Sequence, residues 1–298
     1  MDYRRLGSTG VKVSRLALGC GNFGGVGSAP AFFGKGDGGG RSESYLGGWL
    51  KTRGSAVRDR LVLSTKVFNP VGPGPNQRGL SRLHIARQIE ASLTRLGTDR
   101  IDLYLIHEPD PTTPIDETLR ALDDAMRAGK ILYIGASNIE AWRIAVARGV
   151  SDLRGLVRFE WVQNSYSLLD RSAEREMLPF CADQRVGFTA FSPLAGGWLT
   201  GKYHSGQAYP DGSRMTMRPE PYLHLATERV FQGLDGLADI AQARGVAVEA
   251  LALAWVLHQP QVDAAIVGPR TPAHLDRALA ALDVALSPAE AAELAALF

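Results

Sequence analysis

The stretch RIDLYLIHEPD, residues 100 to 110, decides the fold of this chain. Its middle is apolar without alternation, which predicts a strand that is buried on both faces, as in parallel sheets. His107, Glu108 and Asp110 stand at its C-terminal end. Functional groups of parallel α/β proteins gather where the carboxyl ends of strands meet their following loops. His107 is therefore a site candidate, whereas the two carboxylates are expected to solvate the loop.

Two other predicted strands end in the same way. LVLSTK places Lys66 at its end, and ILYIGASN places Ser137 and Asn138 at its own. Parallel strands share one carboxyl edge, so these three strand ends should lie together. They predict a catalytic face made of Lys66, His107 and the pair Ser137 and Asn138.

The rest of the chain alternates predicted strands with predicted helices and has no linker, which favours one parallel α/β domain over residues 1–298. A short hairpin precedes the main fold, Ser81 is expected to cap a helix, and the last helix opens at Ser287 and Pro288. Further helices are expected over residues 173–184 and 223–244. Seven core strands are expected, near residues 16–18, 61–66, 101–106, 131–136, 160–164, 187–191 and 263–267. A (β/α)8 barrel requires eight. Residues 19–40 are so rich in glycine that no helix is expected there.

Composition excludes several classes of function. The 33 Lys and Arg residues balance 31 Asp and Glu residues, so the net charge of +2 predicts neither a nucleic-acid partner nor an anionic membrane surface. No run is long and apolar enough for a membrane span or a secretory signal, and a cytoplasmic location is expected. Cys20 and Cys181 lack metal-ligand spacing, so no metal site is predicted.

A dinucleotide fingerprint is a weaker alternative. Gly19, Gly21 and Gly24 satisfy GxGxxG after a predicted strand. That motif also needs an immediate helix and an acidic strand end downstream, and the sequence predicts neither of them. The Rossmann interpretation is therefore disfavoured.

The order of the motifs resembles the aldo-keto reductase family along nearly the whole chain. The similar strings are MDYRRLGSTGVKVSRLALG, GRSESYLG, LVLSTKV, DLYLIHEPD, IGASNIE, VQNSYSLLDR, FSPLAGGWLTGKY and IVGPRTP. The resemblance implies a TIM-type (β/α)8 barrel that binds NADPH across its C-terminal mouth and moves hydride to the carbonyl carbon of a small molecule.

The resemblance also assigns residues. Lys66 matches the family's active-site lysine, and His107 matches its substrate-orienting histidine. Phe191 stands where the family usually has a Tyr stacked on the nicotinamide ring. The positions that hold the nicotinamide carboxamide match Ser137, Asn138 and Gln163.

A second group of matched residues lies along the rest of the cofactor. The loop beside the pyrophosphate matches Ser192, Leu194, Gly196, Leu199 and Lys202. The adenosine phosphate site matches Gly268 and Arg270, and a guanidinium there favours the extra phosphate of NADP. The family's Gln, Glu and Asn toward the adenosine are replaced by His274, Arg277 and Ala278, of which His274 is expected to contact the cofactor.

The largest departure from the family follows the first strand. There the family has a helix, a strand, an Asp and the catalytic Tyr, whereas this chain runs from FFGKG directly into DGGGRSE, with Asp37 where the Tyr would be. One helix-strand repeat is therefore expected to be missing or remodelled, which agrees with the count of seven strands. Two strand edges that a closed barrel would pair should then lie open.

The first functional hypothesis is an NADP-dependent oxidoreductase with impaired or altered acid catalysis. Without its Asp and Tyr partners, Lys66 should have a lowered pKa unless another carboxylate such as Asp37 faces it. Tyr45 lies inside a predicted helix, where a surface or packing role is expected. Two alternatives are an NADPH-binding pseudoenzyme or interaction module, and non-redox chemistry based on Lys66.

Overall fold

The structure is a computed structural model that describes residues 2–25 and 39–298. The chain divides into two compact units. Unit 1 comprises Met1–Pro30, Asn164–Ala182 and Gly187–Phe298, and unit 2 comprises Ala31–Gln163 and Asp183–Val186. The prediction of a single domain stays a prediction.

Unit 2 is built on parallel strands. In spatial order they are β7 (Trp161–Ser165), β6 (Ile131–Ser137), β5 (Ile101–Ile106) and β4 (Ser64–Val67), and the last two residues of β7 belong to unit 1. All six residues of β5 are buried, which confirms the expected double-sided burial. The register pairs Lys66 with Leu105 and Ser137 with Gln163, so the predicted site residues stand at the carboxyl edge.

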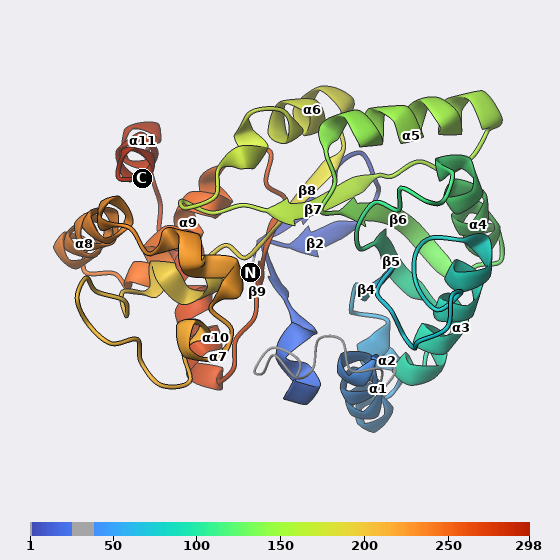
Figure 1. Cartoon of the computed structure of the whole chain (residues 1–298), viewed down its shortest axis with the longest axis horizontal. Helices are drawn as coiled ribbons and strands as arrows, with labels where there is room; N and C mark the ends of the chain where they lie inside the picture. Colours follow the sequence, from blue (N-terminus) through green and yellow to red (C-terminus); the bar gives the residue numbers. More distant parts are fainter. Residues whose placement is uncertain (1, 26–38) are drawn as a thin grey trace. The chain divides into compact units, whose positions relative to one another are not determined.

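Helices of unit 2 cover the outer face of these strands (Figure 1). They are α1 (Arg41–Arg53), α2 (Ser55–Arg58), α3 (Arg82–Leu96), α4 (Ile115–Arg127) and α5 (Ala141–Arg154). As predicted, the Ser81 hydroxyl accepts a hydrogen bond from the His84 N–H and begins α3. Tyr45 lies in α1 and is exposed, in agreement with its expected surface position.

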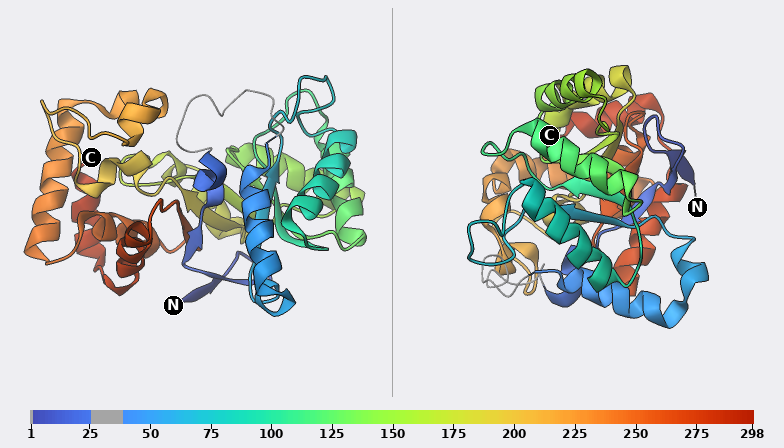
Figure 2. Two further views of the ribbon diagram at one scale, coloured as in Figure 1. Left: turned by 90° about the horizontal axis from the view of Figure 1, so that it is seen from below. Right: turned by 90° about the vertical axis from the view of Figure 1, so that its right-hand side faces the viewer.

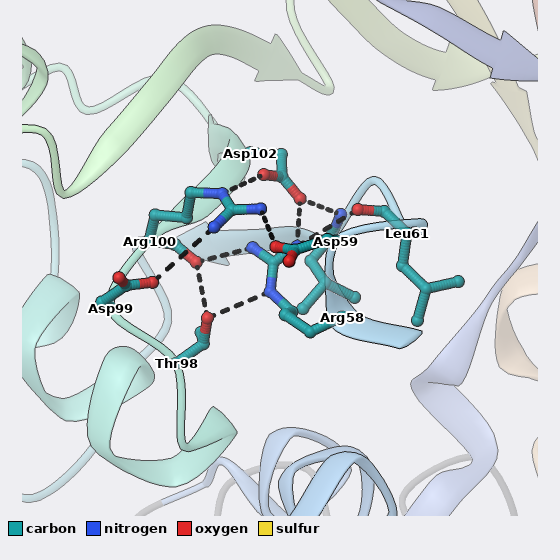
Figure 3. A network of polar contacts seen from close by, with 8 residues as sticks. Arg58, Asp59, Leu61, Thr98, Asp99, Arg100 and Asp102 are labelled. Atoms are coloured by element: carbon teal, nitrogen blue, oxygen red, sulfur yellow. Dashed lines mark hydrogen bonds and ion pairs between the residues drawn. The ribbon is translucent and has the colours of Figure 1, made fainter. Parts of the chain in front are cut away.

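The amino end of β5 carries a buried polar network (Figure 3). Arg58 and Asp102 form an ion pair of 2.9 Å, and both side chains are about nine-tenths buried. Asp102 also accepts the Leu63 N–H at 2.7 Å, while Arg58 donates to the Thr98 hydroxyl and to the Arg100 carbonyl. The network ties the approach to β4 to the start of β5.

Unit 1 contains a hairpin and three parallel strands. The hairpin of β1 (Tyr3–Arg5) and β2 (Lys12–Ser14) is antiparallel, as predicted. The parallel strands, in spatial order, are β3 (Leu16–Leu18), β9 (Ala264–Val267) and β8 (Gly187–Phe191).

The helices of unit 1 include one whose middle is apolar and buried. In α9 (Val248–His258) every residue from Ala250 to Leu257 is buried, and α8 (Glu228–Ala243) and α10 (Pro272–Leu279) pack against it (orange to red in Figure 2). The helices are η1 (Cys20–Gly25), η3 (Ser172–Glu174), α6 (Met177–Gln184), η4 (Ala195–Thr200), α7 (Arg214–Met217), η5 (Glu220–Leu225), α8 (Glu228–Ala243), α9, α10 (Pro272–Leu279), η6 (Ala280–Asp283) and α11 (Pro288–Ala296), and the end of α6 reaches into unit 2.

No single helix within residues 2–25 and 39–298 is long and apolar enough to cross a membrane. The helices α8 and α9 are bent by 96° relative to each other, and they meet the criteria of length and composition only when they are taken together.

Three helix predictions need correction. Residues 20–25 form the 3-10 helix η1, although no helix was expected in this glycine-rich stretch; its tight turns suit small residues. The helix predicted over residues 223–244 is interrupted, because Thr227 caps α8 and separates it from η5. The helix predicted over residues 173–184 is likewise split into η3 and α6.

The expected number of core strands is confirmed: seven parallel strands occur in the described part of the chain. Among these strands, β4 pairs only with β5 in unit 2, and β3 pairs only with β9 in unit 1. The segment in which the sequence predicted a missing repeat, including Asp37, lies mostly outside the described residues.

Candidate active site

The five predicted site residues of unit 2 are linked by one series of interactions. Lys66 is the penultimate residue of β4, and its charge acts on His107, which follows β5. The Asn138 side-chain amide donates to the His107 carbonyl oxygen at 2.9 Å and to the Ser137 hydroxyl at 3.3 Å. The Ser137 hydroxyl donates to the Gln163 carbonyl oxygen at 2.7 Å. The structure therefore brings together the lysine, the histidine and the polar pair that the sequence placed at three strand ends.

Lys66 is half-buried, and burial lowers the pKa of its ammonium to about 8. No carboxylate among residues 2–25 and 39–298 forms an ion pair with it. This agrees with the expected fall of its pKa. A lysine of this kind is partly neutral near pH 8 and can accept or donate a proton.

His107 is neutral at ordinary pH. Burial, and after it the positive charge of Lys66, lower the pKa of its imidazole to about 4. Its N–H donates to the Val67 carbonyl oxygen at 2.8 Å, which locks the residue to the end of β4. A neutral imidazole carries one donor and one acceptor nitrogen, so its tautomer decides what it can offer a substrate.

One residue of this site was missed by the sequence analysis. The Asn69 side-chain amide lies 2.9 Å from the His107 Nδ1 atom. The preceding residue, Phe68, has φ 146°, a region that costs a side-chain-bearing residue on the order of 1–3 kcal/mol. The only sequence signal was position, since Asn69 is the first polar side chain in the loop after β4.

Asp110 is structural, as expected for its carboxylate. Burial alone would raise its pKa, but hydrogen bonds from Thr112, the Leu80 N–H and Thr113 lower it to about 2. The carboxylate therefore fixes the loop after β5 to the start of α3. Glu108 is exposed.

In unit 1 the loop after β8 has an unusual backbone. Ser192, Ala195, Gly196 and Gly197 all have positive φ, at 52°, 47°, 65° and 99°. Gly197 suits its φ of 99°, which residues with a side chain rarely adopt, and the Lys202 Nζ atom lies only 2.6 Å from where its Cβ would be. The N–H groups of Ala195 and Gly197 donate to the carbonyl oxygens of Ser192 and Leu194, each at 2.8 Å, so hydrogen bonds within the loop hold this turn.

A cluster of basic side chains stands beside this loop in unit 1. Burial lowers the pKa of Lys202, and the charges of Arg270 and Arg214 lower it further. Burial also lowers the pKa of His274, followed by the charges of Arg277, Arg270 and Lys202. Glu249 pairs with Arg277 at 2.6 Å and offsets part of this charge, so the remaining cations of this cation cluster favour an anion.

The cation cluster lies at the start of α10. The Thr271 hydroxyl accepts the His274 N–H and caps the helix, and the helix dipole adds to the positive potential there. The Arg270 guanidinium also donates to the Gly212 carbonyl oxygen at 2.7 Å. Gly212 belongs to the long loop between η4 and α7.

Not every predicted cofactor residue of unit 1 is brought to the cation cluster. The side chain of Leu199 is fully buried in the core, so only its backbone could meet a ligand. Phe191 ends β8 and is half-buried. Contacts of Ser192, Leu194 and Gly268 with a cofactor stay predictions.

Comparisons with known proteins find relatives along nearly the whole chain. Residues 25–298 match the model of the aldo/keto reductase family. The chain is 37% identical to an uncharacterized oxidoreductase, YrpG, of Bacillus subtilis, with 96% of this chain and 92% of the relative covered. It is also 37% identical to a probable voltage-gated potassium channel subunit beta of Arabidopsis thaliana, over 95% of this chain and 92% of the relative. An L-glyceraldehyde 3-phosphate reductase of Escherichia coli is 33% identical, over 95% of this chain and 88% of the relative.

Proposed function

The chain belongs to the aldo/keto reductase family, and from that premise we propose that this oxidoreductase uses NADPH to interconvert a carbonyl compound and its alcohol. The observation that carries the proposal is the placement of Lys66, whose pKa is lowered, and a neutral His107 at the carboxyl ends of two paired strands, where the charge of Lys66 acts on His107. NADPH, when bound, would supply the hydride.

The residues of unit 2 supply proton chemistry. A neutral His107 can donate one hydrogen bond to a carbonyl oxygen and so orient it. Lys66 exchanges a proton near neutral pH, since burial brings the pKa of its ammonium to about 8. The family's Tyr has no counterpart in the sequence, so we propose that acid catalysis is altered and that standard aldehydes react slowly.

The residues of unit 1 fit the phosphate groups of the cofactor. The cation cluster contains Lys202 and Arg270 at a helix N-terminus, and Arg binds phosphate through two parallel hydrogen bonds. The pKa of Lys202 is lowered first by burial and then by the charges of Arg270 and Arg214, and an anion would relieve the repulsion among these cations.

Replacement of Arg270 by Ala tests this cofactor choice. Hydrogen bonds to charged groups contribute about 1.5–3 kcal/mol, so the Kd for NADPH should rise about 10- to 100-fold while that for NADH stays unchanged. Fluorescence titration measures both values. Arg154→Ala, on α5 of unit 2, is the matched control. Equal affinity of the wild type for NADPH and NADH would contradict the proposal.

A second candidate function is regulatory. Relatives of similar identity include both reductases and a probable potassium channel subunit. An oxidoreductase fold that binds NADPH without rapid turnover could report the redox state of the cofactor pool to a partner. The distinguishing observation is tight NADPH binding together with undetectable oxidation of bound NADPH by aldehydes.

A further inference from the structure

His107 is held at three points within unit 2. Its backbone N–H donates to the Val67 carbonyl oxygen at 2.8 Å, and its own carbonyl oxygen accepts from the Asn138 amide at 2.9 Å. The third contact joins the ring Nδ1 atom to the Asn69 Nδ2 atom at 2.9 Å. Within residues 2–25 and 39–298, Nε2 makes no hydrogen bond to another residue.

The chemistry of the third contact fixes the direction of the hydrogen bond. The Nδ2 atom of an asparagine carries two protons and accepts none, so it must donate to Nδ1. A neutral imidazole with an accepting Nδ1 carries its proton on Nε2. Nε2–H is then the free donor of the ring, and it can approach a carbonyl oxygen. The opposite tautomer would present a lone pair there and repel the oxygen.

The backbone conformation of the preceding residue positions Asn69 beside the His107 ring. Phe68 has φ 146°, which is rare for a residue with a side chain, and its carbonyl oxygen accepts the Gly79 N–H at 2.8 Å. The strained residue lies between Val67, which binds His107, and Asn69. Backbone strain of this kind persists only where the surrounding structure enforces it, and it concentrates at functional sites.

We propose that Asn69 is a positioning residue whose side-chain amide holds His107 in the tautomer protonated on Nε2, so that Nε2–H meets the substrate's carbonyl oxygen. The role toward a substrate rests on the proposed function. The tautomer itself does not depend on any activity, so the two can fail separately.

Histidine labelled with ¹⁵N tests the proposal directly. Long-range ¹H–¹⁵N NMR spectra distinguish a protonated from an unprotonated ring nitrogen, and His107→Gln identifies the relevant signals. The wild type should show Nε2–H alone at pH 7. Asn69→Asp replaces a donor by an acceptor, so it should move the proton to Nδ1, whereas the matched control Asn76→Asp in the same loop should leave it on Nε2.

Kinetics provide the second readout. Loss of one well-placed donor to a developing oxyanion costs about 10²–10³ in kcat, so Asn69→Asp should lower kcat for 4-nitrobenzaldehyde by about that factor. Its Kd for NADPH should change by less than about threefold, since no charge contacting phosphate is lost. Asn76→Asp should keep the wild-type kcat.

Two results would overturn the proposal: a wild-type His107 protonated on Nδ1 alone, or an Asn69→Asp protein in which Nδ1 of His107 stays unprotonated. If Asn69→Asp does not fold, Asn69→Ala should show a mixture of both tautomers, and a pure Nε2–H form would equally overturn it. A wild type that shows Nε2–H but reduces no aldehyde would count against the proposed function and would leave the assigned tautomer intact.

Discussion

The two ends of strand β5 treat charge in opposite ways. At the amino end, Arg58 and Asp102 are buried together and satisfied by further hydrogen bonds (Figure 3). At the carboxyl end, burial lowers the pKa of Lys66 and His107, and no carboxylate in the described residues pairs with either. Paired charges hold a structure together, whereas a buried, unpaired base is available for proton transfer. The difference indicates which end is structural and which is chemical.

Removing a charge at the amino end should have the largest effect. Asp102→Ala leaves the buried guanidinium of Arg58 without its counter-charge and the Leu63 N–H without an acceptor. Breaking a buried pair costs about 3–5 kcal/mol in the free energy of unfolding. Urea denaturation measures the loss. If Asp102→Ala were as stable as the exposed control Asp99→Ala, the amino end of β5 would not have the structural role that distinguishes it from the carboxyl end.

Two glycines of α1 test the packing of unit 2 without changing any charge. A Cβ on Gly47 would collide with the Arg95 carbonyl oxygen, because α1 lies directly against α3, whereas a Cβ on Gly48 would meet open space. Gly47→Ala should therefore destabilise by about 1–3 kcal/mol. Gly48→Ala should stabilise α1 by about 0.5–1 kcal/mol. Thermal unfolding compares the pair, and equal Tm values would show that α1 and α3 are not in such close contact.

The smallest expected effect is the pH dependence at the carboxyl end. The pKa of Lys66 is about 8 in the folded protein and 10.5 as its ordinary value. Between these values the unfolded chain binds more protons, so the contribution of Lys66 to the free energy of unfolding rises with pH. Lys66→Met should be more stable than the wild type at pH 7, by at most about 1 kcal/mol after solvent screening, and the difference should vanish by about pH 10.5.

The measurement is urea denaturation of both proteins at pH 7, 9 and 10.5. Lys51→Met, at an exposed position of α1, serves as the control and should show no such trend. A wild type that is more stable than Lys66→Met at pH 7 would mean that the ammonium has a counter-charge after all.

The sequence predicted the parts of the molecule that repeat a simple pattern. The unbroken apolar run of β5, the polar ends of three strands and the Ser81 cap are local signals, and the structure confirms them. A site residue such as Asn69 carries no such signal, because its contact with His107 spans 38 residues and depends on the strained turn at Phe68. The ion pair of Arg58 and Asp102 was not predicted either, because the two residues are 44 positions apart and only the tertiary fold brings them together.

Breaks in helices were missed for a related reason. The apolar periodicity of residues 223–244 continues across Thr227, but the Thr227 hydroxyl accepts the Val230 N–H and starts a new helix there. A capping side chain can end or begin a helix at a single residue. A periodic pattern that is averaged over many residues does not reveal such a cap.

The central claim is that Lys66 works at an NADPH-dependent site that lacks the family's acid. NADPH oxidation with 4-nitrobenzaldehyde, measured beside a fluorescence titration for the wild type and Lys66→Met, tests it most directly. We predict that both proteins bind NADPH with Kd values within about threefold of each other, because Lys66 carries no phosphate contact. Turnover by the wild type should be slower than about 1 s⁻¹, the low end for enzymes, and at least about tenfold slower in Lys66→Met. Wild-type turnover on the order of 10 s⁻¹, or no NADPH binding by either protein, would contradict the account.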